Sequence, residues 1–283
     1  MTRGVLIFAQ NNSDIDYAKI AVFAAARVKK YLNVPVSLVT DSMDWLLASQ
    51  PHAKEVFDKI IPIWVDTTQT RKFFDGTLSS RKLVWKNLSR FDCYRLSPYK
   101  ETLVIDSDYI LGSDNLSKIW GSNHDFMIYR SGYDLAQWRD VSSFEYVNQY
   151  SIPFYWATAF YFKKTKTTGA FFKFIEHIKD NWTYYRYLYN IDSVTFRNDF
   201  AFSIAIHMMN GCVDGDFAKA LPGTLIYALD RDILVDLKEG AMQFLLEKEN
   251  YNGEYTLMKT EGVDVHVMNK FSLTRIIDGA PNE

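Results

Sequence analysis

The sequence VLIFA at residues 5–9 is the starting point for the fold, because it is a short apolar run that ends at a polar residue, Gln10. Such a run is typical of a buried β-strand. A helical pattern follows over residues 15–31, and residues 34–39 (VPVSLV) repeat the strand pattern. A strand, a helix and a strand in this order form a βαβ unit, whose two strands lie parallel in one sheet. We therefore expect an α/β fold with a Rossmann-like, mixed but mostly parallel central sheet flanked by helices.

The same patterns predict further elements along the chain. Ser13 or Asp14 is the expected N-cap of the first helix. No linker, repeat or break in composition marks a domain boundary, so we expect residues 1–283 to form a single domain. The other expected strands are residues 60–65, 102–105, 126–129 and 156–162, the other expected helices are residues 169–180, 199–209 and 238–248, and residues 263–268 are a final apolar segment.

Composition excludes several classes of protein. The 283 residues are 48% hydrophobic and 23% charged, with 13 Gly and 7 Pro, which excludes a disordered or collagen-like chain. The net charge of −2 argues against a global field that would hold the chain on nucleic acid or an anionic membrane. Because the apolar run at residues 5–9 is too short for a signal peptide and no apolar stretch is long enough to span a bilayer, we expect neither export nor membrane insertion. Because Cys93 and Cys212 are isolated, we expect a reduced, cytoplasmic location.

The strand expected at residues 102–105 ends in Asp106, Ser107 and Asp108. Carboxylates one residue apart on a turn can bind a single hard divalent cation, Mg²⁺ or Mn²⁺, whose other positions take water and substrate phosphates. Aspartate-rich turns also occur simply as solvated caps. Ligands of open α/β sheets bind at the carboxyl ends of the strands, which favours the metal interpretation here.

Several segments, in order, resemble the GT-A nucleotide-sugar glycosyltransferases, most closely family eight, the glycogenin-like and bacterial galactosyltransferase relatives. The resemblance spans residues 5–270 and extends to glycosyltransferases of bacteriophages. It departs from the family pattern at Ala159, where the family has Gly, and lacks the Gly after His266 and the Pro-Trp after Lys270. The matching segments are residues 81–83 (RKL), 96–99 (LSPY), 103–108 (LVIDSD), 156–162 (WATAFYF), 197–202 (RNDFAF) and 266–270 (HVMNK).

The resemblance implies a GT-A fold and a metal-dependent enzyme that transfers a hexose or pentose from a nucleotide-sugar donor, UDP-sugar being favoured, with retention of anomeric configuration. Residues 1–112 would be the nucleotide-binding half, and residues 113–283 the acceptor half with the C-terminal metal and diphosphate element. Mn²⁺, or Mg²⁺, would be bound by Asp106, Asp108 and His266. His266 can also be read as an ordinary strand histidine.

The resemblance also implies the residues that contact the donor. Asp199 and Arg81 would be catalytic. Asp41 and Asp199 have structural alternatives, as a strand-end turn and a helix N-cap, and Lys270 can be a surface lysine. The implied donor contacts are Gln10, Asn11, Tyr17, Asp41, Arg81, Ser107, Thr158 and Lys270.

The acceptor is a glycan by analogy or, less favoured, a hydroxymethylated base in phage DNA. The DNA acceptor needs a phosphate track, for which the sequence offers residues 71–100, with eight Lys or Arg against two Asp, and the lysines Lys163, Lys164 and Lys166. The aromatic residues 182–189 predict an acceptor or dimer contact, or a core edge. Nucleotidyl transfer and a non-catalytic carbohydrate-binding module are the alternatives to sugar transfer, and a first strand followed by no glycine disfavours the former.

Overall fold

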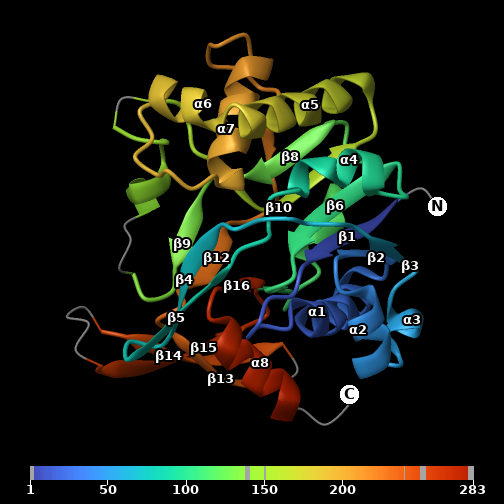
Figure 1. The fold of residues 1–283 in the computed structure, drawn as a ribbon, viewed down its shortest axis with the longest axis vertical. Coiled ribbons are helices and arrows are strands. Elements are labelled where there is room, and N and C mark those ends of the chain that lie inside the picture. The colour runs from blue at the N-terminus through green and yellow to red at the C-terminus, as the bar shows by residue number, and fades with distance from the viewer. Residues whose placement is uncertain (1–2, 138–140, 150, 239, 249–252, 280–283) are drawn as a thin grey trace.

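A computed structural model of the chain describes residues 3–137, 141–149, 151–238, 240–248 and 253–279. Its centre is a seven-stranded sheet in the order β11-β8-β10-β6-β1-β2-β3 (Figure 1). β10 runs antiparallel to both of its neighbours, and the other adjacent pairs are parallel, which confirms the expected mixed, mostly parallel α/β sheet. The strands are β1 (Arg3–Ala9), β2 (Val36–Thr40), β3 (Lys59–Pro62), β6 (Glu101–Asp106), β8 (Phe126–Tyr129), β10 (Trp156–Lys163) and β11 (Lys219–Ala220).

The first βαβ unit forms as the sequence predicts. α1 (Tyr17–Leu32) packs small buried side chains such as Ala18 and Ala21 close to the sheet, so that β1 and β2 pair in parallel. The expected N-cap was wrong: Asp16 caps the helix, because its Oδ1 accepts from the backbone of Lys19 at 3.0 Å. Asp14 instead forms an ion pair with Arg81.

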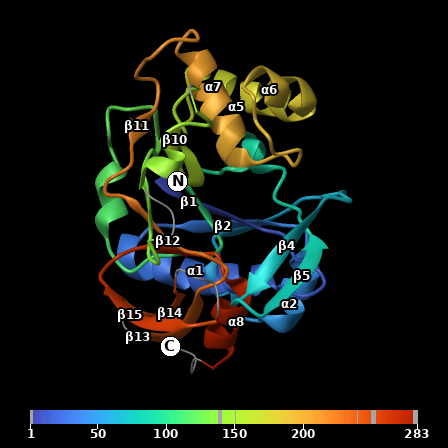
Figure 2. The same ribbon diagram turned by 90° about the vertical axis from the view of Figure 1, so that its left-hand side faces the viewer.

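Helices cover both faces of the sheet, as Figure 2 shows. α1 lies on one side, together with α2 (Met43–Ser49) and α3 (Ala53–Val56). On the other side, α5 (Lys166–Asp180) and α7 (Asn198–Met209) pack on β8 and β10 through a cluster of phenylalanines, and α6 (Trp182–Leu188) packs against α5. Shorter helices and 3₁₀ turns are α4 (Cys93–Leu96), η1 (Arg90–Asp92), η2 (Asn115–Ile119) and η3 (Val141–Phe144).

A second layer of short strands follows the central sheet. A four-stranded sheet in the order β7-β16-β12-β9 lies beside a three-stranded sheet in the order β13-β14-β15, and α8 packs on β13. These elements are β7 (Tyr109–Ile110), β9 (Gly132–Asp134), β12 (Leu225–Ala228), β13 (Ile233–Lys238), β14 (Ala241–Glu247), β15 (Tyr255–Glu261), β16 (Val265–Val267) and α8 (Lys270–Gly279).

The helix expected at residues 238–248 was wrong, because this segment contains the end of β13 and the whole of β14, which pair antiparallel. In β14 the side chains of Met242, Phe244 and Leu246 are buried and alternate with less buried ones, which is the period of two that a half-buried strand requires.

A two-stranded hairpin, β4 (Thr70–Asp75) and β5 (Ser79–Val84), crosses the front of the molecule in Figure 1. Phe73 and Leu83 bury their side chains in the core beneath it. A bidentate ion pair between Asp75 and Arg275 ties its end to α8. The hairpin is therefore packed against the body of the protein beside the carboxyl ends of β1 and β6.

Candidate active site

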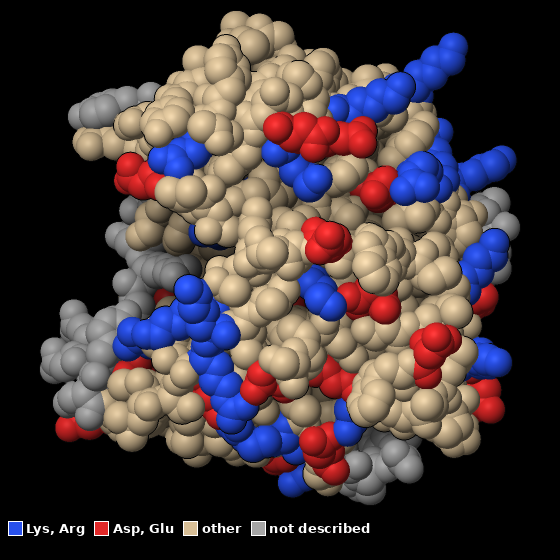
Figure 3. Space-filling view, viewed as in Figure 1, with Lys and Arg blue, Asp and Glu red and all other residues tan. Residues whose placement is uncertain are grey.

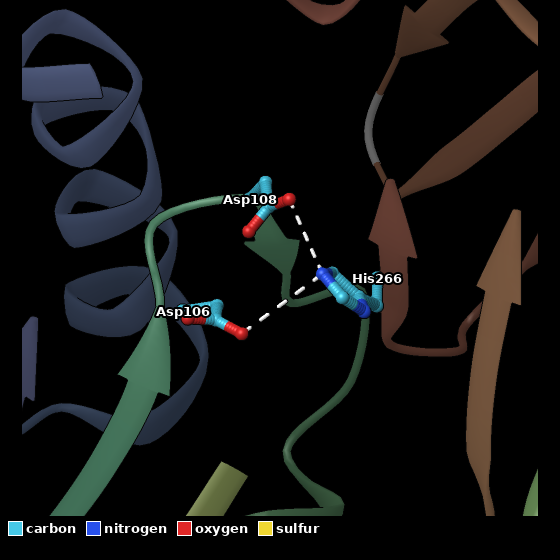
Figure 4. A group of neighbouring side chains, drawn as sticks. All are labelled: Asp106, Asp108 and His266. Atoms are coloured by element: carbon cyan, nitrogen blue, oxygen red, sulfur yellow. Dashed lines mark hydrogen bonds and ion pairs between the residues drawn. The ribbon is translucent and has the colours of Figure 1, made fainter. Parts of the chain in front are cut away.

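Three side chains from two distant segments of the chain converge beyond the carboxyl end of β6 (Figure 4). Asp106 ends β6, Asp108 lies in the turn before β7, and His266 is the central residue of β16. Nε2 of His266 is 3.2 Å from Oδ2 of Asp108 and 4.0 Å from Oδ2 of Asp106. One potential ligand atom from each residue lies within 4.8 Å of the others, which is close enough for one cation to contact all three.

Backbone pairing brings His266 to the aspartates. β16 pairs antiparallel with β7, with His266 opposite Tyr109, and the backbone of Val267 donates to the carbonyl of Asp108 at 2.9 Å. The approach is tight at Gly112, where a Cβ atom would lie 2.2 Å from the carbonyl oxygen of Val263. A side chain at residue 112 would push β16, and with it His266, away from the aspartates.

Neighbouring side chains hold the three residues in place. Thr158 Oγ1 is 3.4 Å from Nδ1 of His266, so the ring nitrogen facing away from the aspartates has a partner. Asp106 forms an ion pair with Arg90, a fully buried arginine that also donates to the carbonyl of Ala157. Burial lowers the pKa of Arg90 to about 10, against the attraction of Asp199 and Asp108, which leaves it charged at neutral pH.

Lys270 is a second positive group at this cluster, after Arg90, and its Nζ is 2.6 Å from Oδ2 of Asp108. Burial by itself raises the pKa of the Asp108 carboxyl, but the charges of Lys270 and His266 outweigh it and hold that pKa well below its usual range. Two carboxylates and one imidazole are a donor set that suits Mn²⁺ and similar divalent ions. The residues present therefore fit the metal that the sequence predicts.

The cluster forms one wall of a pocket between β1, β6, β10, β16, α7 and the hairpin. Most of the sequence-predicted site residues meet there. Those that line the pocket are Gln10, Tyr17, Asp106, Ser107, Asp108, Thr158, Asp199, His266 and Lys270.

Three predicted residues are not among those that line this pocket. Asn11 accepts from the backbone of Ala18 and donates to Asp16, so its side chain holds the turn before α1. Arg81 is half exposed on the hairpin and pairs with Asp14. Asp41 lies in a neighbouring hollow at the ends of β2 and β3, and Lys86 joins it to the main pocket with its Nζ 2.6 Å from Oδ2 of Asp41.

Asp199 does not cap α7, because Arg197 occupies the N-cap position and Asp199 is in the first turn. Its Oδ1 accepts from the backbone of Ala157 at 2.9 Å and its Oδ2 pairs with Arg197 at 2.8 Å. These contacts hold Arg197 and the start of α7 against β10.

Sequence reasoning missed several pocket residues. The basic character of residues 71–100 was a signal, but it did not single out Arg71, Lys86 or the buried Arg90. Asn198 and Trp156 lie in two of the matching segments, but the resemblance did not single them out as site residues. The other unpredicted residues of the pocket lining are Phe8, Phe73, Val84, Trp85, Asn87, Arg197 and Met268.

Apart from the guanidinium of Arg90, which pairs with Asp106, three buried polar atoms in the pocket lining have no hydrogen-bond partner in the described part of the chain. They are Gln10 Nε2, Trp156 Nε1 and Asn198 Oδ1. Because an unsatisfied buried polar group costs about 1–3 kcal/mol, these three atoms favour hydrogen bonds to water or to a polar ligand in the pocket.

The expected phosphate track along Lys163, Lys164 and Lys166 does not adjoin this site. Lys163 pairs with Glu101 at the beginning of β6, whereas the aspartates lie at its other end. Lys163 and Lys164 donate to the carbonyls of Ser122 and Ser97. The length of β6 therefore separates these lysines, at its amino end, from a ligand in the pocket at its carboxyl end.

The aromatic segment 182–189 divides between core and surface. Trp182 and Tyr185 are buried on α6, whereas Tyr184, Tyr187 and Leu188 are exposed. The oligomer contact predicted there stays a prediction. Within the described residues, no helix has the length and apolar character needed to cross a membrane.

No protein-family model and no curated protein matches the sequence. Among solved structures, the chain is similar to the glycosyltransferase GlyE of Streptococcus pneumoniae, with a TM-score of 0.44 and 12% identity over 78% of this chain and 45% of GlyE, so it spans less than half of that relative. It is also similar to an active-site mutant of LgtC, with a TM-score of 0.45 and 11% identity over 76% of this chain and 71% of LgtC. A third similar structure is mouse xyloside xylosyltransferase 1, with a TM-score of 0.41 and 10% identity over 78% of this chain and 85% of that one.

Proposed function

We propose that the chain is a metal-dependent glycosyltransferase, which moves a sugar from a nucleotide donor to a hydroxyl acceptor. The observation that supports this most is the composition of the pocket. Two carboxylates and an imidazole converge on one point, and cationic side chains, including Lys270, Lys86 and Arg71, surround them. This combination suits a nucleoside diphosphate with a divalent ion, because the carboxylates and the imidazole can bind the ion and the cationic side chains can contact the phosphates. The resemblance to family eight in motif order is a second support.

Asp106, Asp108 and His266 would bind the cation, for which we propose Mn²⁺. The cation supplies charge neutralisation to the diphosphate as it becomes the leaving group. Lys270, adjacent to Asp108, adds a fixed positive charge at the same point. Arg90 neutralises Asp106 from the buried side, so that the two acids can approach each other.

We assign the nucleotide to the side of the pocket formed by Gln10 and Tyr17 and extending through Lys86 towards Asp41, with a UDP-sugar as the preferred donor. The sugar would lie on the opposite side of the pocket, near Thr158 and Asp199. There it could hydrogen-bond to Asn198 Oδ1 and Trp156 Nε1, which have no partner among the described residues. Arg81 would then act at the rim of the site.

In the proposed reaction, the bond between the anomeric carbon and the diphosphate oxygen breaks, and its electron pair stays on the diphosphate. The acceptor oxygen forms a new bond to the anomeric carbon, and its proton passes to the diphosphate. The carboxylate of Asp199 stabilises positive charge at the anomeric carbon. We expect retention of configuration, which ¹H NMR of the product measures directly.

The test is a thermal-shift panel of UDP-, GDP-, CMP- and dTDP-sugars, each with and without Mn²⁺. A ligand that binds only the folded chain adds about 2.7 kcal/mol to its stability at a hundred times its Kd. We expect one nucleotide class to raise the melting temperature, and only with the metal present. Asp108→Asn should abolish this shift and the slow hydrolysis of the donor, because it removes a ligand charge with little change of shape.

Asp192→Asn is the matched control, since Asp192 is exposed and does not line the pocket. It should leave the shift unchanged. If no nucleotide sugar raises the melting temperature of the wild-type chain while a free sugar does, the chain is a carbohydrate-binding module and the transferase proposal is wrong.

A further inference from the structure

The outer face of the β4–β5 hairpin is cationic and has no acid on it. Pairing in the hairpin sets Lys72 directly opposite Lys82, and side chains alternate between its two faces. The buried Phe73 and Leu83 define the inner face. The outer face then consists of Thr70, Lys72, Phe74, Ser80, Lys82 and Val84.

The pair of Lys72 and Lys82 is unfavourable for the isolated protein. Directly opposed side chains of an antiparallel pair have Cβ atoms about 5 Å apart, and like charges in that arrangement are destabilising. Within the described residues neither lysine is paired with a carboxylate, because Asp75 and Asp14 are engaged by Arg275 and Arg81. A bound anion would relieve this repulsion.

The charge of the outer face continues beyond the two lysines. The ammonium of Lys72 lies 4.6 Å from the centre of the Phe74 ring, and the guanidinium carbon of Arg231 lies 4.9 Å from the same centre. In the space-filling view a run of lysines and arginines crosses the front of the molecule in this region (Figure 3). With a net charge of only −2 over the chain, the cationic character is local to this surface.

Lys72 and Lys82 are separate from the donor pocket, since neither lines it. Lys270, Lys86 and Arg71 already supply positive charge inside. The outer face therefore suits an anion other than the donor diphosphate.

The outer face nevertheless leads into the pocket. β5 passes from Lys82 to Val84 and on to Trp85, and the last two residues line the pocket. At about 3.3 Å per residue, Trp85 is about 10 Å from Lys82 along the strand. A polymer that lies on the outer face can thus place its next unit at the mouth.

We propose that the outer face of the β4–β5 hairpin binds the phosphates of a nucleic-acid strand, which is the acceptor of the proposed sugar transfer. Lysines flanked by the hydroxyls of Thr70 and Ser80 match the side chains by which proteins contact a phosphate backbone. Trp85 adds an aromatic face for an unpaired or flipped base, as single-strand binding sites do. The role of the nucleic acid as acceptor rests on the proposed function, whereas its binding to the outer face does not.

The experiment measures fluorescence anisotropy of a labelled 20-nucleotide DNA strand with the full chain, without donor, at several salt concentrations. We expect binding that weakens with salt. Lys72→Gln with Lys82→Gln should raise the Kd about tenfold or more at 100 mM salt and reduce the salt slope by about 1.4, as loss of two phosphate contacts requires. The same double variant should keep or raise the melting temperature, because it removes a like-charge pair.

The control is Lys54→Gln with Lys173→Gln, which removes the same charge from exposed lysines on α3 and α5 and should change the Kd less than twofold. Equal DNA binding by wild type and the Lys72/Lys82 variant would overturn the proposal. A competition experiment gives a second outcome that would overturn the proposal. If poly(glycerol phosphate) displaces the labelled strand at the same phosphate concentration as unlabelled DNA does, the surface binds a phosphate-bearing glycan instead. Since no donor is present, these results are independent of the thermal-shift test of sugar transfer.

Discussion

At the scale of single residues, Lys270 has two opposed effects on the site. Its ammonium is 2.6 Å from Oδ2 of Asp108, so under the proposed function it would compete with the cation for that carboxylate and would also offer charge to the diphosphate. We predict that Lys270→Met tightens Mn²⁺ binding about tenfold in the absence of donor, which corresponds to about 1.4 kcal/mol. The same change should weaken binding of the nucleotide sugar at saturating Mn²⁺.

Isothermal titration calorimetry with Mn²⁺ alone, and then with donor, separates the two effects. Lys86→Met is the control, because Lys86 pairs with Asp41 and not with a metal ligand, and it should change the Mn²⁺ affinity less. Weaker Mn²⁺ binding by Lys270→Met would contradict the assignment of Lys270 as a competitor.

A second residue-scale prediction concerns Asp232, which is buried away from the site between Leu229 and β14. Burial raises its pKa to about 7, although it accepts from the backbone of Glu247 and Leu229. Between pH 4 and pH 7 the folded state therefore binds more protons here than the unfolded state, and this group makes the free energy of unfolding fall as pH rises.

The measurement is urea unfolding of wild type and Asp232→Asn from pH 4 to pH 9. The stability of wild type minus that of the variant should fall by an amount on the order of a few kcal/mol up to pH 7 and then stay level. A constant offset from the lost acceptor leaves this shape unchanged. A difference that rises with pH would show that the folded state favours the charged form of Asp232.

At the same scale, local sequence patterns predict only the site residues that adjoin a recognisable strand end, whereas residues such as Tyr17 and Thr158 were predicted by the family resemblance. Asp106, Ser107 and Asp108 follow a clear apolar run, so their place at a sheet edge is predictable. Trp156 and Asn198 reach the same pocket from β10 and α7 through packing of distant elements, which no local pattern records. His266 was assigned by family resemblance, since three residues of β16 carry little periodic signal.

At the scale of elements, the hairpin depends on its two buried anchors. We predict that Phe73→Ala destabilises the chain by about 3–5 kcal/mol, as truncation of a buried phenylalanine usually does. It should also weaken donor binding, because Phe73 and its neighbour Arg71 line the pocket. Leu78→Ala, at the 95% exposed tip of the same hairpin, should change stability by less than about 0.5 kcal/mol.

Thermal unfolding and the donor titration compare the two hairpin variants. Equal effects of Phe73→Ala and Leu78→Ala on both measurements would contradict a hairpin fixed by its inner face. The element bounds themselves are predictable where periodicity is long, as in α1 and α5. They are not predictable for β13 and β14, whose six or seven residues carry mixed burial and acids that also suit a helix.

At the scale of the whole molecule, the basic side chains of residues 71–100 are distributed between the two ends of β6. The sequence groups Arg71, Arg95 and Lys100 in one run of 30 residues, but the sheet separates them. Arg71 lies at the carboxyl end of β6 in the pocket, whereas Lys100 precedes its first residue. The sequence therefore shows how many basic residues the segment contains. Their positions in space follow only from the sheet topology.

The pairing of His266 with Tyr109 also has a consequence for the order in which the protein assembles. The two aspartates leave the ribosome early, whereas the imidazole follows 158 residues after Asp108. A nascent chain that has reached β10 has its first sheet strands and both carboxylates, but it lacks the third ligand and Lys270. The three side chains can come together only after translation has passed β16, so under the proposed function a partly synthesised chain would not yet transfer sugar.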